Sequence, residues 1–431
     1  MNNEAQLLII VLNFTFSLIE CRKLYNNLLY IYKMKKAKNI VVVYGSGASR
    51  ASGYKVMVNK KSIDPPTDIN FFEDIDKISP HFLKSKYPAL WCFKDIYFAS
   101  HSNPGMEEVW TALDLNFKHI KLASYNWTSE TKYYFRKVKN RSKNMDIASP
   151  SNRLVMDKPP KDFSKYKFLG ECGRDFRNLI YDIYSPYKIS KYDTNNYRLL
   201  DQFLHNKSNL NFIGYITFNY DCYLEDALVS ESRKFRYIDR NSYSETPEAL
   251  LDREIPIVKL HGSLNWNEKL KGDFYKIDYR LPYSKVKQIR PKYVDDYNWD
   301  QPAIIPPTIF KQEINDDSRI EHNLTQTILQ QWRTAITMLE LADKIIFVGY
   351  SFPISDFHAK RIFQIANMIR RIETNKDVTD ILYCVGPSTE RNYKINCKEK
   401  VANIFKNISI DDIIVGFDKL LKSKKLQKFL K

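Results

Sequence analysis

The sequence predicts an α/β fold built on a doubly wound, parallel β-sheet. The main observation is five short runs of consecutive apolar residues, the pattern of strands that are buried on both faces. These runs span residues 40–44, 215–218, 257–260, 345–349 and 381–385. Helical patterns separate several of them, and strand–helix alternation is typical of a doubly wound sheet. Ligands of such sheets bind at the carboxyl ends of the strands.

The helical patterns also predict an insertion. Residues 330–343 place Trp332, Ile336 and Leu339 on one helix face, which suits a helix that covers the sheet. The connection from Ser49 to Thr217 is too long for a simple crossover, and residues 106–117 and 172–184 within it form amphipathic patterns. We therefore expect one domain over residues 37–431, with a helical insertion lobe over about 75–210. A second long connection, residues 266–307, is rich in Tyr, Asp and Pro, and we expect it to cover the site as a lid.

Residues 1–36 are expected to form a helical extension. Their apolar stretch, residues 7–19, is shorter than the roughly 20 residues that a membrane span needs, and Asn13, Thr15 and Ser17 interrupt it. No basic residue precedes the stretch, which argues against a signal peptide. We expect a cytoplasmic protein whose first helix packs on the domain or on a partner chain.

The chain is strongly basic, with 67 Lys and Arg against 50 Asp and Glu and a formal charge of +17. This surplus is compatible with nucleic acid or an anionic cofactor as partner, and equally with a solvated lysine-rich surface. Residues 131–167 are the most basic segment, expected to be a loop that is either solvated or a contact for a partner. The six cysteines include no Cys-x-x-Cys pair, so we expect buried thiols and no zinc site.

Four motifs follow the predicted strands in order, at the edge where a ligand would bind. They are Gly45-Ser46-Gly47-Ala48-Ser49, Thr217-Phe218-Asn219-Tyr220-Asp221, His261-Gly262 and Gly349-Tyr350-Ser351. Glycine lets the backbone come close to a ligand, and amides at a strand-to-helix turn can face a phosphate. Arg50 occupies the position where a dinucleotide-binding fingerprint has its third glycine, which argues against a hydride-transferring dehydrogenase.

This ordered set resembles the sirtuin-like family of NAD-consuming enzymes. The resemblance is closer to the bacterial branch found in anti-phage defence, which typically shows three further runs. These are Pro65-Pro66-Thr67-Asp68 before Phe71-Phe72, Ile305-Pro306-Pro307-Thr308, and the run from Ser351 to His358. It covers residues 38–420 and implies a Rossmann-like sheet with NAD as the substrate.

The resemblance also implies the roles of individual residues. Asn219 would orient the ribose and the attacking water, and His261 would be the catalytic histidine. The residues implied to bind NAD are Gly45, Ser46, Gly47, Ala48, Ser49, Asp68, Thr217, Asp221, Gly349, Tyr350, Ser351, Asp356 and His358, with Gly386 and Ser388 at the adenosine. Some have structural alternatives. Asp68 and Asp221 would equally suit helix caps for residues 71–78 and 223–228, and His358 a core or capping position.

The function that this resemblance implies is NAD glycohydrolysis, producing nicotinamide and ADP-ribose, in anti-phage defence by NAD depletion. One alternative is an NAD-dependent deacylase or ADP-ribosyltransferase. Phe218, where sirtuin deacylases carry Gln, and the missing zinc module weigh against deacylation. Another alternative is a non-catalytic NAD-binding assembly subunit. We expect a homo-oligomer, or a complex with a HerA-type ATPase or another defence partner, and no membrane association.

Overall fold

The computed structural model describes the greater part of the chain. The described residues are 38–99, 103–122, 164–185, 187–189, 195–206, 210–237, 254–271, 274–279, 292–295, 298–304, 319–352, 357–374, 380–386, 397–401, 404–405 and 413–431. The predicted N-terminal helix, nearly all of the basic segment 131–167, and two predicted site residues, Asp356 and Ser388, lie outside these ranges.

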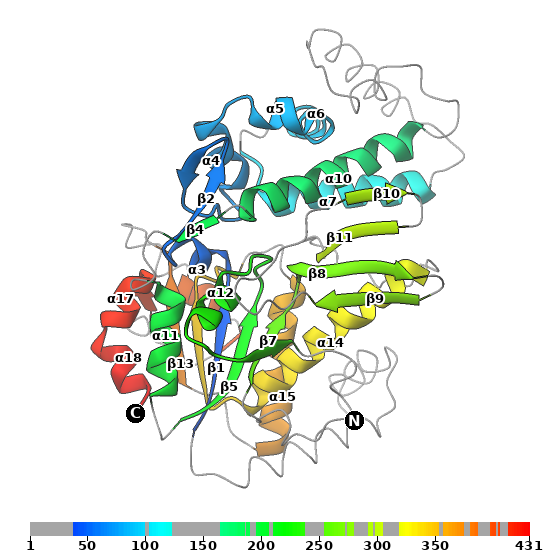
Figure 1. Cartoon of the computed structure of the whole chain (residues 1–431). Coiled ribbons are helices and arrows are strands. Elements are labelled where there is room, and N and C mark those ends of the chain that lie inside the picture. The colour runs from blue at the N-terminus through cyan, green and yellow to red at the C-terminus, as the bar shows by residue number, and fades with distance from the viewer. Residues whose placement is uncertain are drawn as a thin grey trace.

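A seven-stranded sheet forms the centre of the molecule (Figure 1), in the order β14-β13-β12-β1-β5-β7-β6. Every neighbouring pair in it is parallel. The strands are β1 (Lys38–Tyr44), β5 (Leu210–Thr217), β6 (Phe235–Tyr237), β7 (Ile255–Lys259), β12 (Lys344–Val348), β13 (Asp380–Val385) and β14 (Ile413–Val415). This confirms the predicted fold class and all five predicted strands. The two edge strands, β6 and β14, were not predicted.

Helices cover both faces of this sheet, so alternate residues of each strand enter different cores. Ile40, Val42 and Tyr44 of β1 belong to one apolar cluster, whereas Val41 and Val43 belong to the other. In Figure 1, α11, α17 and α18 lie on one side of the sheet, and α14 and α15 on the other. The bounds of these helices, and of α12 after β5, are α11 (Asn196–His205), α12 (Tyr223–Ser230), α14 (Arg319–Leu341), α15 (Phe357–Thr374), α17 (Phe417–Lys422) and α18 (Lys424–Phe429).

The chain between β1 and β5 forms a mainly helical lobe over one end of the sheet (Figure 1). Its helices are α3 (Ser46–Arg50), α4 (Phe71–Ile78), α5 (Phe82–Lys86), α6 (Pro88–Tyr97), α7 (Met106–Leu122) and α10 (Ser164–Tyr184). A small antiparallel sheet joins β2 (Tyr54–Val58) with β3 (Lys61–Ile63) and β4 (Tyr187–Ile189). The amphipathic patterns at 106–117 and 172–184 lie within α7 and α10.

The connection 266–307 contains β-strands that the sequence analysis did not predict, and its role as a lid stays a prediction. Four strands, in the order β10-β11-β8-β9, form an antiparallel sheet there. They are β8 (Gly262–Lys271), β9 (Phe274–Tyr279), β10 (Lys292–Asp295) and β11 (Asn298–Ile304). The pairing between β8 and β11 joins residues more than 30 positions apart, which local composition does not reveal.

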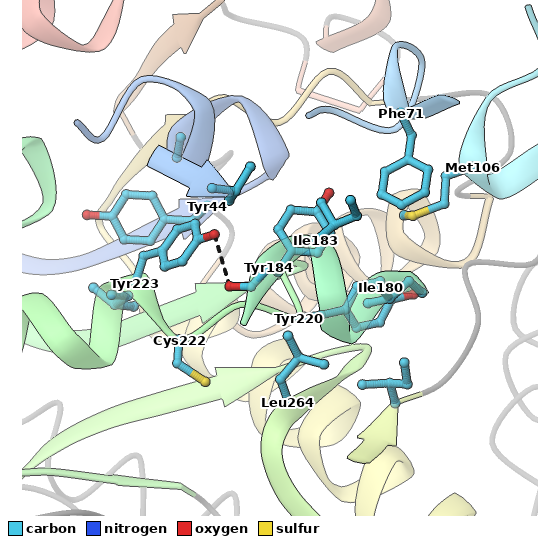
Figure 2. Close-up of a cluster of buried hydrophobic side chains, with 14 of the residues drawn as sticks. Tyr44, Phe71, Met106, Ile180, Ile183, Tyr184, Tyr220, Cys222, Tyr223 and Leu264 are labelled. Carbon is cyan, nitrogen blue, oxygen red and sulfur yellow. Dashed lines mark hydrogen bonds between the residues drawn. The ribbon is translucent and has the colours of Figure 1, made fainter. Parts of the chain in front are cut away.

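The lobe and the sheet share one apolar core. Figure 2 shows lobe side chains, among them Phe71, Ile180 and Tyr184, beside Tyr220 and Leu264 from the segments that follow β5 and begin β8. A hydrogen bond from the Tyr223 hydroxyl to the Tyr184 carbonyl, 3.3 Å long, crosses between the two parts. The lobe is therefore packed onto the strand ends where the motifs lie.

None of the helices in the described ranges is both long enough and apolar enough to cross a lipid bilayer. Five cysteines fall in those ranges, and all five are buried free thiols.

Candidate active site at the carboxyl ends of the parallel strands

Two glycine turns meet where the strand order reverses. From β1 the sheet continues to β5 on one side and to β12 on the other, so the ends of β1 and β12 mark the topological switch point. The Gly45 amide donates to the Val348 carbonyl, and the Gly47 amide donates to the Gly349 carbonyl, each over 3.0 Å. Ligands of open parallel sheets bind in the crevice at this position.

The close contact between the two turns explains their glycines. A Cβ on Gly45 would lie 2.6 Å from the Gly349 carbonyl oxygen, and one on Gly349 would lie 2.1 Å from the Ala48 amide nitrogen. Gly349 also has a φ of +66°, which L-residues other than glycine rarely adopt. The amides of Gly45, Gly47 and Ala48 all donate to protein carbonyls. Binding of a pyrophosphate by this turn stays a prediction.

Asn219 is tied directly to the glycine turn. Its side-chain amide donates to the Gly45 carbonyl at 3.0 Å and to the Ser49 hydroxyl at 2.8 Å. Ser49 in turn donates to the Asp221 carboxylate at 2.6 Å and lies 3.1 Å from the Tyr197 hydroxyl. Ser49 thus uses its one proton and both lone pairs. Asn219 is 8% exposed, and the network fixes the orientation of its amide.

Asp221 accepts from the first amide of α12, as a capping side chain would, although Cys222 occupies the N-cap position of that helix. One carboxylate oxygen accepts from Ser49, and the other accepts from the Tyr223 amide at the start of α12. Burial raises the pKa of this carboxyl to about 6, although the nearby Lys259 ammonium and the Ser49 hydrogen bond lower it. A ribose contact by Asp221 stays a prediction.

His261 lies between β7 and β8, beside the Asn219 loop. The Leu260 amide donates to the Thr217 carbonyl at 3.0 Å, so the ends of β5 and β7 remain paired beyond the strands. The imidazole is 5% exposed, with its ring centre 5.5 Å from that of Phe218 and 5.9 Å from that of Tyr220. The imidazole therefore lies among aromatic rings at the same edge of the sheet as Asn219.

An aromatic stack connects His261 to the switch point. Phe218 lies face to face with Tyr350, with ring centres 4.2 Å apart and planes inclined by 9°. Tyr350 follows Gly349, and its carbonyl accepts from the Tyr383 hydroxyl at 2.7 Å. The motifs after β1, β5, β7 and β12 thus converge on one edge of the sheet.

Asp68 caps a different helix from the one considered in the sequence analysis. Its carboxylate accepts from the Glu107 amide at 2.7 Å, at the start of α7, and its carbonyl accepts from the Met106 amide at 3.0 Å. The helix that starts at Phe71 has Asn70 at its N-cap position. The expected cap for 71–78 is therefore wrong, because a helix about 40 residues downstream takes the carboxylate.

The other predicted residues are placed as follows. Thr217 is buried, and its hydroxyl accepts a hydrogen bond from the backbone amide of Asn219 at 3.1 Å. Ser351 is exposed beyond the Gly349 turn, Gly386 directly follows β13, and His358 lies in the first turn of α15.

Two residues of the site were missed by sequence reasoning. Tyr197 reaches Ser49 from α11, and nothing in the sequence near Tyr197 indicates this contact. Lys259, the last residue of β7, is fully buried and donates to the Glu225 carboxylate at 2.8 Å. The signal that could have revealed Lys259 is its position, because it is a charged residue at the end of an otherwise apolar strand.

A cavity of about 590 Å³ lies in the lobe, away from these motifs. It is lined by Met57, Asn59, Ser79, His81, Phe82, Ser85, Lys86 and Asp182. Its lysine ammonium, that of Lys86, is paired with Asp182 at 2.5 Å. None of the predicted site residues lines it. Among the described ranges no group of three or more His, Cys, Asp or Glu side chains is arranged to hold a metal ion.

Residues 213–401 match the family model of the SIR2-like domain. This segment contains Asn219, His261 and the Gly349 turn. The Gly45 turn and Asp68 precede it. Comparison with curated proteins gives no match.

Several solved structures resemble the chain at low sequence identity. A Sir2 homologue–NAD complex is 13% identical, with 94% of this chain and 95% of that one covered and a TM-score of 0.35. A mutant Sir2 homologue in complex with ADP-ribose is 13% identical, with 93% and 98% covered and a TM-score of 0.33. Sir2 bound to an acetylated peptide is 11% identical, with 94% and 99% covered and a TM-score of 0.33.

Proposed function

We propose that this protein is a sirtuin-like NAD glycohydrolase that cleaves NAD to nicotinamide and ADP-ribose. The observation that supports this most strongly is the hydrogen-bonded link between Asn219 and the Gly45–Ser49 turn, with His261 beside it at the same sheet edge. This is the switch point where parallel sheets bind dinucleotides. The match of residues 213–401 to the SIR2-like domain supports the same assignment.

In the proposed reaction, water attacks the anomeric carbon of the nicotinamide ribose as the glycosidic bond breaks. The bonding electrons leave with nicotinamide, which departs neutral from its cationic form. Asn219 orients the ribose and the water, since its amide is already fixed by Gly45 and Ser49. His261 accepts the proton that the water loses, which a neutral imidazole does near pH 7. The products are nicotinamide, ADP-ribose and one proton.

Deacylation is the less favoured use of the same site. Sirtuin deacylases carry Gln where this chain has Phe218, and the Phe218 ring is stacked on Tyr350 and offers no hydrogen bond. A non-catalytic NAD-binding subunit is also less favoured, because both Asn219 and His261 are retained and lie at the same edge.

The biological setting that we propose is NAD depletion in anti-phage defence, in the cytoplasm. An enzyme that consumes NAD needs restraint, so we expect control by homo-oligomerisation or by a partner such as a HerA-type ATPase. Light scattering at micromolar concentration, alone and with a neighbouring ATPase, tests this. A strictly monomeric protein with full activity would contradict it.

The direct test is incubation of the purified protein with NAD, with and without an acylated peptide. We expect nicotinamide and ADP-ribose in both cases. His261→Ala should lower the rate by about 10²–10⁴-fold, the usual loss for a general base. His205→Ala is the matched control, because His205 is partly buried near the opposite end of the sheet. Cleavage only with the peptide would favour deacylation. Binding without cleavage would favour an assembly subunit.

A further inference from the structure

The ammonium group of Lys259 is buried next to the candidate site, at the end of β7. Lys259 ends β7 and is 0% exposed. Its Nζ donates to the Asp221 carbonyl at 2.5 Å and to the Glu225 carboxylate at 2.8 Å. An isolated charge in a protein interior is costly, so this lysine requires both partners.

The counter-ion is equally enclosed. Glu225 lies on α12 and is 0% exposed, and the oxygen that accepts from Lys259 also accepts from the Tyr237 hydroxyl at 2.8 Å. Tyr237 in turn accepts from the Asn265 amide at 2.8 Å. The ion pair and its hydrogen bonds therefore connect β7 with α12, β6 and β8.

The ammonium also connects the two candidate catalytic groups. Along its own strand, Lys259 is two residues before His261. Through space, it holds the carbonyl of Asp221, two residues after Asn219. The Asp221 carboxylate in turn accepts a hydrogen bond from the Ser49 hydroxyl, and that hydroxyl accepts one from the side-chain amide of Asn219. One side chain therefore constrains both loops.

We propose that Lys259, with Glu225 as its counter-ion, is a positioning residue that sets the placement of Asn219 relative to His261. This rests on the proposed function for the roles of those two residues. An apolar pair of similar volume would fill the same space, and buried ion pairs are often replaced in this way with the fold retained. It would not hold the Asp221 carbonyl, which is why the position requires a donor.

The test is the double variant Lys259→Met/Glu225→Leu, which removes both charges together. We expect a folded protein whose kcat for NAD cleavage falls by about 10²-fold, the loss typical of a misplaced reacting group. The Kd for NAD should change by less than about 3-fold, since only transition-state positioning is lost. Lys344→Met is the matched control, because Lys344 is also buried but lies at the first position of β12, at the opposite end of the sheet.

Three results would overturn the proposal: an unchanged kcat in the double variant, a change in Kd alone, or an equal loss of kcat in Lys344→Met. If the double variant does not fold, Lys259→Arg replaces it. The planar guanidinium keeps the charge beside Glu225 but not the geometry of the contact with Asp221, so the same loss of kcat is expected.

Hydrogen exchange separates this proposal from the proposed function. Amides of residues 217–223 should exchange faster in the double variant than in wild type, and not in Lys344→Met. A wild-type protein that does not cleave NAD would refute the proposed function alone. Unchanged exchange at residues 217–223 would refute the positioning by Lys259, whatever the activity.

Discussion

Replacing Gly349 with alanine should destabilise the protein, whereas the same change at Gly173 should stabilise it. At Gly349 the new methyl group would lie 2.1 Å from the Ala48 nitrogen and 2.4 Å from the Gly47 carbonyl carbon, both backbone atoms. The φ of +66° adds strain of about 1–2 kcal/mol for an L-residue. Overpacking against backbone adds about 1–3 kcal/mol. The expected total is about 2–5 kcal/mol.

Gly173 provides the matched control. It lies in α10, and a Cβ there would meet no heavy atom within 4 Å. Alanine in a helix interior is about 0.5–1 kcal/mol more favourable than glycine. The two variants therefore carry the same chemical change with opposite expected signs.

Scanning calorimetry at pH 7 measures the difference. Unfolding entropy of about 2.1 cal/mol/K per residue makes 1 kcal/mol worth roughly 1 °C in a chain of this length. Gly349→Ala should lower Tm by about 2–5 °C, and Gly173→Ala should raise it by about 0.5–1 °C. Equal Tm values for Gly349→Ala and wild type would refute the close packing of the two turns at the switch point.

Three further outcomes are expected. Asn219→Ala should lower NAD turnover by about 10²-fold with NAD binding retained, and an unchanged turnover number would remove Asn219 from the mechanism. Asp221→Asn should change the pH dependence of stability. Burial raises the folded-state pKa of Asp221 from 3.8 to about 6, so its protonation favours folding below pH 3.8, and this contribution is lost as pH rises through 6. The unfolding free energy of wild type relative to the variant should therefore fall by about 2 kcal/mol from pH 4 to pH 7. Urea titrations of both proteins at each pH measure this difference, and a difference that does not change with pH would contradict the assignment. Chelator-free protein should contain no stoichiometric zinc by elemental analysis, because the six cysteines lack paired spacing; one zinc per chain would contradict this.

The central sheet could be predicted because burial on both faces leaves a continuous apolar run. Val41, Val42 and Val43 could not alternate with polar residues, since helices cover both sides. The edge strands β6 and β14 are three residues long, too short for such a run. The β2–β3 hairpin was missed although its signal was present. Tyr54, Val56 and Val58 are buried alternately, and Asn59 and Lys60 have the positive φ values of a type I′ turn.

The site was predicted from chain order, but its contacts were not. Motifs that follow parallel strands must share an edge, so the proximity of Asn219 and His261 follows from the sheet alone. The cap that Asp68 gives to α7 and the contact of Tyr197 with Ser49 depend on how distant helices pack. Their partners lie 39 and 148 positions away, beyond any local pattern.

During synthesis of the chain, β1 leaves the ribosome long before the two strands that it pairs with, β5 and β12. The Asn39 amide, at the start of β1, donates to Asp343, 304 residues later, and β1 also pairs with β5. At about 5–20 residues per second, a ribosome takes roughly 15–60 s to make that interval. Until β5 is made, the apolar run that begins at Ile40 has neither neighbour, and it lacks β12 for the whole interval. Closing such long loops is slow. The nascent chain should therefore depend on chaperones, and truncation before β12 should give aggregated protein instead of a smaller folded unit.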